Sequence, residues 1–264
     1  MPPKTPVEAN ATVVRHEALG GCLYRLWVRP DWDIDAKGWH AGQFVRLGIP
    51  EGVPEDRKNA RAYSFAGVTD GVFEFYIVEV EGGKTSPRLN KLRADDRLWC
   101  EEKISGHFSL DRNPPGKRCI MVGTGAGIAP FLCMVRHGGE AYSAYEQVVL
   151  VHQVRHREHL VYADELAAWA GTQDRHRYVP ILSKPASRFT SLQGHAPLHG
   201  YVQDRLEDGT LDAVAGSPLS PDDTVVMLCG NPDMIKSMTA ALEARGLNRH
   251  KKSRPGHVIT ERYW

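Results

Sequence analysis

An apolar run, Cys119–Val122, leads directly into Gly123-Thr124-Gly125-Ala126-Gly127-Ile128-Ala129-Pro130. We expect the run to be a buried strand and the glycines to form its turn into a helix. Glycines let a ligand approach the backbone closely, and the amides at a helix N-terminus favour an anion such as a pyrophosphate. The stretch predicts a parallel α/β domain that binds a dinucleotide; a tight turn without a ligand is the other interpretation.

A second motif, Arg61-Ala62-Tyr63-Ser64-Phe65, precedes the first along the chain. On a strand, Arg61 and Tyr63 share one face while Ser64 points to the other. A cation, a ring and a hydroxyl in this order suit a planar cofactor with a phosphate tail. An ordinary strand with a surface arginine is the alternative.

Together and in this order, the two motifs resemble the Arg-x-Tyr-Ser flavin motif and the Gly-Thr-Gly-x-Gly-Ile-Ala-Pro nucleotide motif of the ferredoxin–NADP⁺ reductase family. The resemblance covers nearly the whole chain. Other stretches similar to the family are Glu74–Val78, Gly83–Pro87, Cys229–Pro232 and the ending Thr260–Trp264, which is similar to the tail of the bacterial branch.

The pattern of apolar residues divides the chain in two. Short strands between Gly, Pro and Asp turns predict a small antiparallel β-barrel at residues 1–112, which the resemblance assigns to FAD. A linker, Asp111–Lys117, contains two prolines and a glycine, which argue against regular structure. Strands then alternate with helices, which predicts a parallel sheet in an α/β domain at 118–264, assigned by the resemblance to NADP(H).

The expected strands of the barrel are Thr12–Arg15, Leu23–Val28, Phe44–Ile49, Ala62–Ala66, Phe73–Val80 and Arg97–Cys100, with one helix at Pro87–Lys91 capped by Ser86. The expected strands of the second domain are Arg118–Val122, Gln147–His152, Tyr178–Leu182 and Val225–Cys229, and its helices are Ile128–Val135, Ala163–Ala170, Tyr201–Glu207 and Asp233–Ala244.

The composition excludes several classes of protein. A net charge of +1 argues against a nucleic-acid binder, and the absence of a long apolar run argues against a membrane span. The start, Met1–Pro6, is not a secretory signal.

Five cysteines without a Cys-x-x-Cys pair indicate a reducing, cytoplasmic location without a disulfide frame, zinc site or iron–sulfur cluster. A monomer is favoured. We expect His152, His156 and His159 to lie in a polar loop, because their spacing does not suit a metal site.

The resemblance implies catalytic roles for three residues. Ser64 places its hydroxyl near the flavin N5, Cys229 orients the nicotinamide, and Glu261 completes a polar path from Ser64 to solvent. For Cys229, a small buried apolar residue is the other interpretation. The aromatic tail returns to the flavin and must move for hydride transfer. The implied FAD-binding residues are Arg61, Ala62, Tyr63, Ser64, Tyr76, Ile77, Val78, Lys84, Thr85, Ser86, Thr124, Tyr263 and Trp264. For Lys84 and Thr85 a solvated turn, and for Ser86 a helix cap, remain open.

The implied NADP-binding residues are Gly123, Thr124, Gly125, Arg155, Ser183, Lys184, Arg188, Tyr201 and Cys229. Several of them follow strand ends, so we expect them to converge on one cleft. Lys184 replaces the first arginine of the bacterial branch, and Tyr201 stands where that branch has the second. Because lysine meets phosphate without a bidentate fork, the strength of the preference for NADPH over NADH stays open. Scattered surface cations are the other interpretation.

The resemblance implies an enzyme that transfers a hydride between NADP(H) and FAD and single electrons between FAD and ferredoxin or flavodoxin. An NADPH-dependent reductase of free flavin, ferric complexes or an oxygenase is an alternative, and a flavin-binding regulatory protein is a non-catalytic one. The basic run Arg249–Arg254 is either a solvated surface or a docking face for the acidic carrier.

Overall fold

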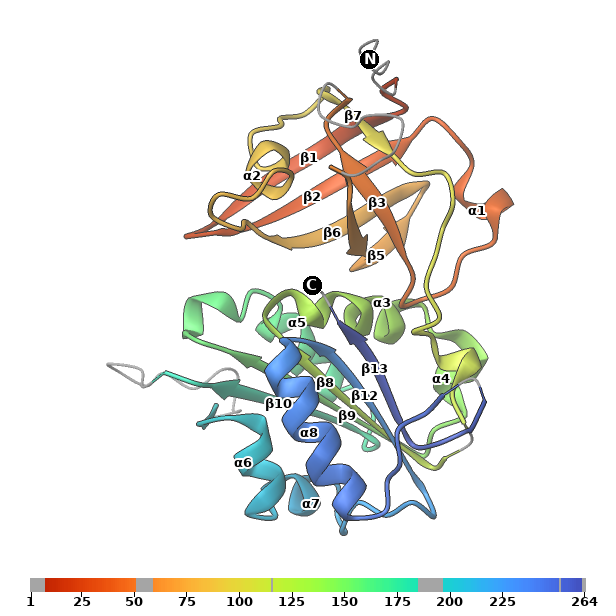
Figure 1. Ribbon diagram of the computed structural model, residues 1–264, viewed down its shortest axis with the longest axis vertical. Coiled ribbons are helices and arrows are strands. Elements are labelled where there is room, and N and C mark those ends of the chain that lie inside the picture. Colours follow the sequence, from red (N-terminus) through yellow and green to blue (C-terminus); the bar gives the residue numbers. More distant parts are fainter. Residues whose placement is uncertain (1–7, 51–58, 115, 185–196, 252, 263–264) are drawn as a thin grey trace. The chain divides into compact units, whose positions relative to one another are not determined.

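The computed structural model describes residues 8–50, 59–114, 116–184, 197–251 and 253–262. The chain forms two compact units (Figure 1). Unit 1 comprises Met1–Ser109 and Leu132–Gly138, and unit 2 comprises Leu110–Phe131 and Gly139–Trp264. None of the described helices is long and apolar enough to cross a membrane.

Unit 1 is an antiparallel barrel with strand order β4-β3-β7-β1-β2-β6-β5. The strands β4 and β5 stand at opposite ends of this order, yet only two residues separate them along the chain, so the sheet closes on itself. The strands are β1 (Ala11–Gly20), β2 (Leu23–Pro30), β3 (Phe44–Gly48), β4 (Arg61–Ser64), β5 (Gly67–Thr69), β6 (Val72–Val78) and β7 (Arg97–Cys100), and the helices are α1 (Ile34–Lys37) and α2 (Ser86–Leu89).

The core of unit 1 is aromatic. The rings of Phe65 and Phe73 stack with centroids 4.5 Å apart, and Phe75 packs against both. All three side chains are fully buried, which is where large apolar rings contribute most to stability.

Residues from later in the chain complete this unit. The Arg136 guanidinium donates to the Ala66 carbonyl at 2.8 Å and pairs with Glu74 at 2.9 Å. The Val68 amide donates to His137 Nε2 at 3.4 Å. Because the ion pair is largely shielded from water, removing either partner would leave the other charge buried without compensation.

Unit 2 is a parallel sheet of order β11-β10-β9-β8-β12-β13 with helices on both faces (Figure 1). The strands are β8 (Arg118–Thr124), β9 (Gln147–Val154), β10 (His176–Leu182), β11 (Leu198–His199), β12 (Thr224–Gly230) and β13 (Val258–Arg262). The helices are α3 (Ala129–His137), of which Leu132–His137 belongs to unit 1, α4 (Gly139–Ser143), α5 (Ala163–Ala170), α6 (Val202–Glu207), α7 (Thr210–Val214) and α8 (Pro232–Ala244), with 3₁₀ turns η2 (Leu110–Arg112), η3 (Gly125–Ile128) and η4 (Arg157–His159).

Alternate residues of the strands face opposite helix layers. Ile120, Val151 and Leu228 point to the side that α6, α7 and α8 cover. The helix α5 packs against β10, and its buried residues lie outside that cluster. The chain runs from β8 outward through β9 to β11 and then returns to β12 on the other side of β8. In sheets of this kind, ligands bind at the carboxyl ends of the strands beside such a reversal.

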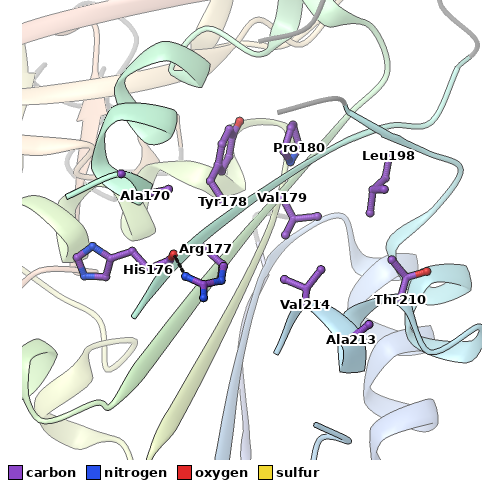
Figure 2. Close-up of a pocket in the computed structure, with 11 residues that line it drawn as sticks. Ala170, His176, Arg177, Tyr178, Val179, Pro180, Leu198, Thr210, Ala213 and Val214 are labelled. Carbon is purple, nitrogen blue, oxygen red and sulfur yellow. Dashed lines mark hydrogen bonds between the residues drawn. The ribbon is translucent and has the colours of Figure 1, made fainter. Parts of the chain in front are cut away.

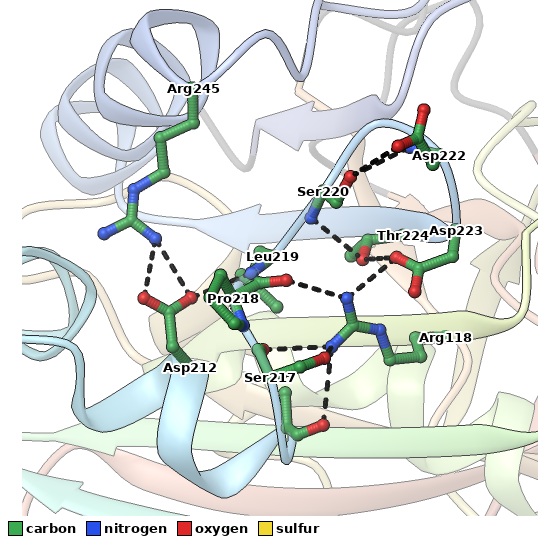
Figure 3. A network of polar contacts seen from close by, with 11 residues as sticks. Arg118, Asp212, Ser217, Pro218, Leu219, Ser220, Asp222, Asp223, Thr224 and Arg245 are labelled. Carbon is green, nitrogen blue, oxygen red and sulfur yellow. Dashed lines mark hydrogen bonds and ion pairs between the residues drawn. The ribbon is translucent and has the colours of Figure 1, made fainter.

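A buried arginine organises the opposite, amino end of the sheet (Figure 3). Arg118 begins β8, and its guanidinium donates to the Ser217 and Pro218 carbonyls and pairs with Asp223 at 2.8 Å. Burial of Asp223 raises its pKa, but hydrogen bonds from Arg118 and Thr224 outweigh that effect and hold the pKa below its usual range. The loop before β12 is thereby fastened to β8.

The fold class is confirmed: an antiparallel barrel is followed by a parallel α/β domain. Some local predictions are wrong. The helix α2 begins at Ser86 with Thr85 at its N-cap, so Ser86 is not the cap. The predicted linker begins in the 3₁₀ turn η2. His152 does not lie in a polar loop, because it is fully buried on β9.

Candidate functional site

The Arg-x-Tyr-Ser motif forms β4. Tyr63 is half-buried and packs its ring edge-on against Phe75, with centroids 6.4 Å apart. Burial raises the pKa of Tyr63, an effect that the nearby Arg61 partly opposes, so the phenol stays protonated. Ser64 is buried at the end of the strand, whereas Arg61 and Ala62 are exposed. The strand therefore offers an aromatic surface beside an exposed cation.

The turn before α2 is fastened to the start of this strand. Thr85 Oγ1 donates to the Asn59 carbonyl, and Tyr24 from β2 donates its phenol hydrogen to the Ser86 carbonyl at 2.8 Å. Ser86 Oγ accepts the Val80 amide at 2.9 Å. Lys84 remains exposed. Asn59 thus ties the turn to the residues just before β4, and Tyr24 ties it to β2; no local sequence pattern indicates either contact.

The predicted residues on β6 have unequal access. Tyr76 and Ile77 are buried, at 3% and 1% exposure, while Val78 is half-buried. Consecutive residues of a strand point to opposite faces of the sheet, so the side chains of Tyr76 and Ile77 are buried on different faces of β6. Only their backbone, or Val78, is available to meet a ligand.

The glycine motif packs against the end of β12, backbone to backbone. A Cβ atom on Gly127 would lie 2.4 Å from the Cys229 carbonyl oxygen, and one on Gly230 would lie 2.2 Å from Thr124 Oγ1. Real Cβ atoms do not approach so closely, so only glycine fits at both positions. Thr124 Oγ1 also accepts the Asn231 amide at 2.8 Å. The two loops form one surface at the carboxyl ends of β8 and β12.

Two of the three predicted catalytic residues are neighbours on adjacent strands. Cys229 on β12 is in register with Glu261 on β13. Cys229 is fully buried and Glu261 is half-buried. Ser64, the third, lies in unit 1. The pairing places a thiol and a carboxylate at the same edge of the sheet as the glycine motif.

The predicted phosphate-binding cations gather at the ends of β9 and β10. The Ser183 amide donates to the Val154 carbonyl and the Lys184 amide to the Arg155 carbonyl, so the two strand ends continue side by side. Arg155 and Lys184 are both exposed. Tyr201, the N-cap of α6, is 45% exposed.

Arg188, Tyr263 and Trp264 lie outside the described residues. For the others, the structure forms three groups: the β4 and α2 segments in unit 1, the glycine motif with Cys229 and Glu261, and the cations with Ser183 and Tyr201 in unit 2. The sequence interpretation missed Asn231, whose side chain caps α8 by accepting the Asp233 and Met234 amides. An Asn-Pro-Asp sequence before a helix is a recognisable signal for that cap.

A pocket of about 690 Å³ lies elsewhere in unit 2 (Figure 2). It follows the outer edge of β10 from His176 to Pro180, between the end of α5 and α7. Its lining lies away from the carboxyl ends of the strands, where the predicted residues gather. Several backbone groups along this edge cannot pair with another strand. The His176 amide donates to the Gln173 carbonyl, the His176 carbonyl accepts from Arg177, and Pro180 has no N–H.

Comparison with known proteins gives a consistent result. Residues 121–240 match the family described as oxidoreductase NAD-binding domain. The flavodoxin/ferredoxin–NADP reductase of Escherichia coli strain K12 is 33% identical over 226 residues, which span 85% of this chain and 87% of that protein. The ferredoxin–NADP reductase of Pseudomonas aeruginosa is 32% identical over 84% of this chain and 85% of its own length.

The solved structure of a ferredoxin NADP⁺ reductase from Neisseria gonorrhoeae, with bound FAD and NADP, superimposes with a TM-score of 0.84 at 27% identity, covering 97% of this chain and all of that one. Since relatives more than 30% identical extend over most of its length, the chain belongs to the flavodoxin/ferredoxin–NADP reductase family, a family of oxidoreductases.

Proposed function

We propose that this chain is an FAD-dependent enzyme that takes a hydride from NADPH and passes single electrons to ferredoxin or flavodoxin. The observation that carries the proposal is the packing of the glycine motif on Cys229–Asn231, with Glu261 in register beside Cys229. The relatives named above support FAD, NADP(H) and the carriers.

The residues of unit 2 fit a dinucleotide. On one side, Gly127 packs tightly against β12, whereas a Cβ atom on Gly125 would meet nothing within 4 Å. The loop is therefore fixed on one side and open on the other, as the approach of a pyrophosphate requires. Arg155 and Lys184 are exposed cations for a 2′-phosphate, and we propose that Arg188 joins them.

The residues of unit 1 fit a flavin nucleotide. Tyr63 supplies a ring supported by Phe75, and Arg61 and Lys84 supply exposed cations beside a turn that Asn59 holds in place. We assign the FAD-binding role to residues 1–112 and the NADP(H)-binding role to 118–264.

Bound FAD supplies the chemistry of accepting a hydride and releasing electrons one at a time. In this proposal the protein positions the rings and excludes water. Tyr63 covers one face of the flavin, Ser64 offers a hydroxyl at its reacting edge, and Cys229 orients the nicotinamide. Glu261 connects the site to solvent for proton movement.

The test of cofactor identity is direct. The purified chain should be yellow, heat should release FAD, and NADPH should drive reduction of ferricyanide and of a ferredoxin or flavodoxin. Chromatography of the released flavin and the rate with each acceptor are the measurements. Recovery of FMN alone, or a colourless protein that takes up no FAD, would contradict the proposal.

The aromatic tail has a role of its own in the proposal. The family resemblance puts Tyr263 on the flavin face where the nicotinamide binds, and Trp264 against the FAD adenine. Aromatic stacking contributes about 0.5–1.5 kcal/mol beyond area burial, so the tail retains FAD and competes with nicotinamide. Tyr263→Ser should strengthen the long-wavelength charge-transfer band with NADP⁺ and reduce the preference for NADPH over NADH. An unchanged flavin spectrum and coenzyme ratio would show that the tail does not cover the flavin.

A further inference from the structure

The end of β9 carries two buried polar residues in succession. His152 is fully buried and Gln153 is 9% exposed, and both follow the apolar run Val148–Val151. Consecutive residues of a strand point to opposite faces of the sheet. Each of the two side chains reaches a different segment at the carboxyl edge.

His152 holds the glycine motif. It is in register with Gly123, and its Nε2 lies 3.1 Å from the Gly125 carbonyl oxygen. Because a carbonyl only accepts, Nε2 must carry the proton, and burial keeps the ring neutral by lowering the pKa of His152 to about 4. Nδ1 has no hydrogen-bond partner among the described residues. The single N–H of the neutral His152 ring is therefore donated to the glycine motif.

Gln153 holds the start of α6 on the other face. Its Oε1 accepts the Val202 amide at 2.7 Å, the first amide of that helix. The preceding residue is Tyr201, which is exposed beside Ser183 and Lys184 because the Gly200 amide donates to the Leu182 carbonyl. Gln153 therefore fixes the backbone that presents Tyr201.

Packing alone does not explain either residue. Their neighbours on β9 are valines and a leucine, and a buried polar side chain is costly unless its hydrogen bonds are made. The hydrogen bonds of His152 Nε2 and Gln153 Oε1 both go to backbone groups of segments that carry predicted NADP-binding residues.

We propose that His152 and Gln153 are positioning residues for the dinucleotide, with divided tasks. His152 sets the loop that meets the pyrophosphate, which NADP and NAD share. Gln153 sets the α6 start at the adenosine end, where the two coenzymes differ by the 2′-phosphate. The inference rests on the proposed function of unit 2 as the NADP(H)-binding unit.

The experiment measures dissociation constants of NADP⁺ and NAD⁺ for the oxidised holoprotein by calorimetric titration. His152→Met removes the donor at similar volume and should weaken both coenzymes equally, roughly three- to tenfold, as expected for one hydrogen bond. His152→Gln keeps an N–H at the ε position and should bind nearly as the original does. Gln153→Met should weaken NADP⁺ more than NAD⁺. His156→Gln, an exposed neighbour, is the matched control.

The outcomes separate the two proposals. An unsubstituted chain that binds neither coenzyme overturns the proposed function and this inference with it. A chain that binds NADP⁺ while His152→Met and Gln153→Met bind it unchanged overturns the inference alone, as does a His152→Gln variant as weak as His152→Met. If His152→Met does not fold, His152→Asn replaces it, because its shorter amide does not reach Gly125 and must still weaken both coenzymes. FAD content and circular dichroism confirm that each variant is folded.

Discussion

We propose that Lys184 contributes to the choice of coenzyme. It is exposed beside Ser183 and Arg155, and a lysine meets a phosphate as a point charge. Lys184→Ala should raise the Michaelis constant for NADPH roughly tenfold or more, because a charge-assisted hydrogen bond is lost, and leave that for NADH nearly unchanged. Steady-state kinetics with both coenzymes are the measurement. An equal effect on the two would show that the 2′-phosphate is bound elsewhere.

The buried imidazole of His152 also links stability to pH. Its pKa is lowered from 6.5 to about 4, mainly by burial and against the Gly125 hydrogen bond. Between these values the unfolded chain binds a proton that the folded chain does not, so stability falls as pH falls from 6.5 towards 4. The full shift corresponds to about 3 kcal/mol.

The measurement is urea unfolding at a series of pH values for the chain and for His152→Gln. The variant should lose less stability across this range. His137, His159 and His176 also have pKa values that burial lowers, so some pH dependence should remain. If the free energy of unfolding changed with pH by the same amount in both proteins, His152 would not be the source of the pH dependence.

At the scale of elements, the Arg118 network holds the loop before β12 to β8. The Arg118 side chain is 8% exposed, so its removal leaves buried carbonyls without their donor and Asp223 with only the hydrogen bond from Thr224. Arg118→Met should lower the free energy of unfolding by about 3 kcal/mol. Lys117→Met is the matched control, because its pair with Glu146 is exposed and contributes less than about 1 kcal/mol. Equal unfolding midpoints in urea for the two variants would contradict the role of Arg118.

The elements that the sequence predicted share a clear local signal. The helix α5 was predicted with its observed bounds, Ala163–Ala170, and the main strands differ only at their ends. The missed elements are short: β5, β11, α1, α4 and α7 have between two and five residues. The strand β13, Val-Ile-Thr-Glu-Arg, is defined by its register with β12 rather than by its own pattern.

The site was predictable where a motif carried it and not where a distant contact did. The glycine motif and Cys229 were found because their spacing resembles that of a family. The bonds from Tyr24 to Ser86 and from His152 to Gly125 each depend on the closed fold. A histidine at the end of an apolar strand gives no local sign that it will contact a loop from the preceding strand.

At the scale of the whole molecule, the question is how the protein meets its electron carrier. Within the basic run, Arg249 donates to Thr260 and His250 accepts the Gly256 amide, whereas Lys251 and Arg254 are exposed. These two cations are the candidates for contact with an acidic carrier. Since steering by exposed charges is screened by salt, reduction of the carrier should slow steeply between low and physiological ionic strength.

The test compares the double variant Lys251→Ser, Arg254→Ser with Lys236→Ser, an exposed cation on α8. The double variant should slow reduction of ferredoxin or flavodoxin at low salt and leave ferricyanide reduction unchanged. The Lys236 variant should change neither rate. Matching salt profiles for carrier and ferricyanide would show that the run is only a solvated surface.

The barrel of unit 1 includes Leu132–Gly138, a segment that follows the first strand of unit 2 along the chain. During synthesis the ribosome therefore makes all seven barrel strands before Arg136 and His137, which bind Ala66, Glu74 and Val68. A nascent chain stalled at the linker, Asp111–Lys117, lacks the contacts that Arg136 and His137 make with the barrel. The first unit can therefore finish folding only after translation has passed Gly138, when the first strand of the second unit has already been made.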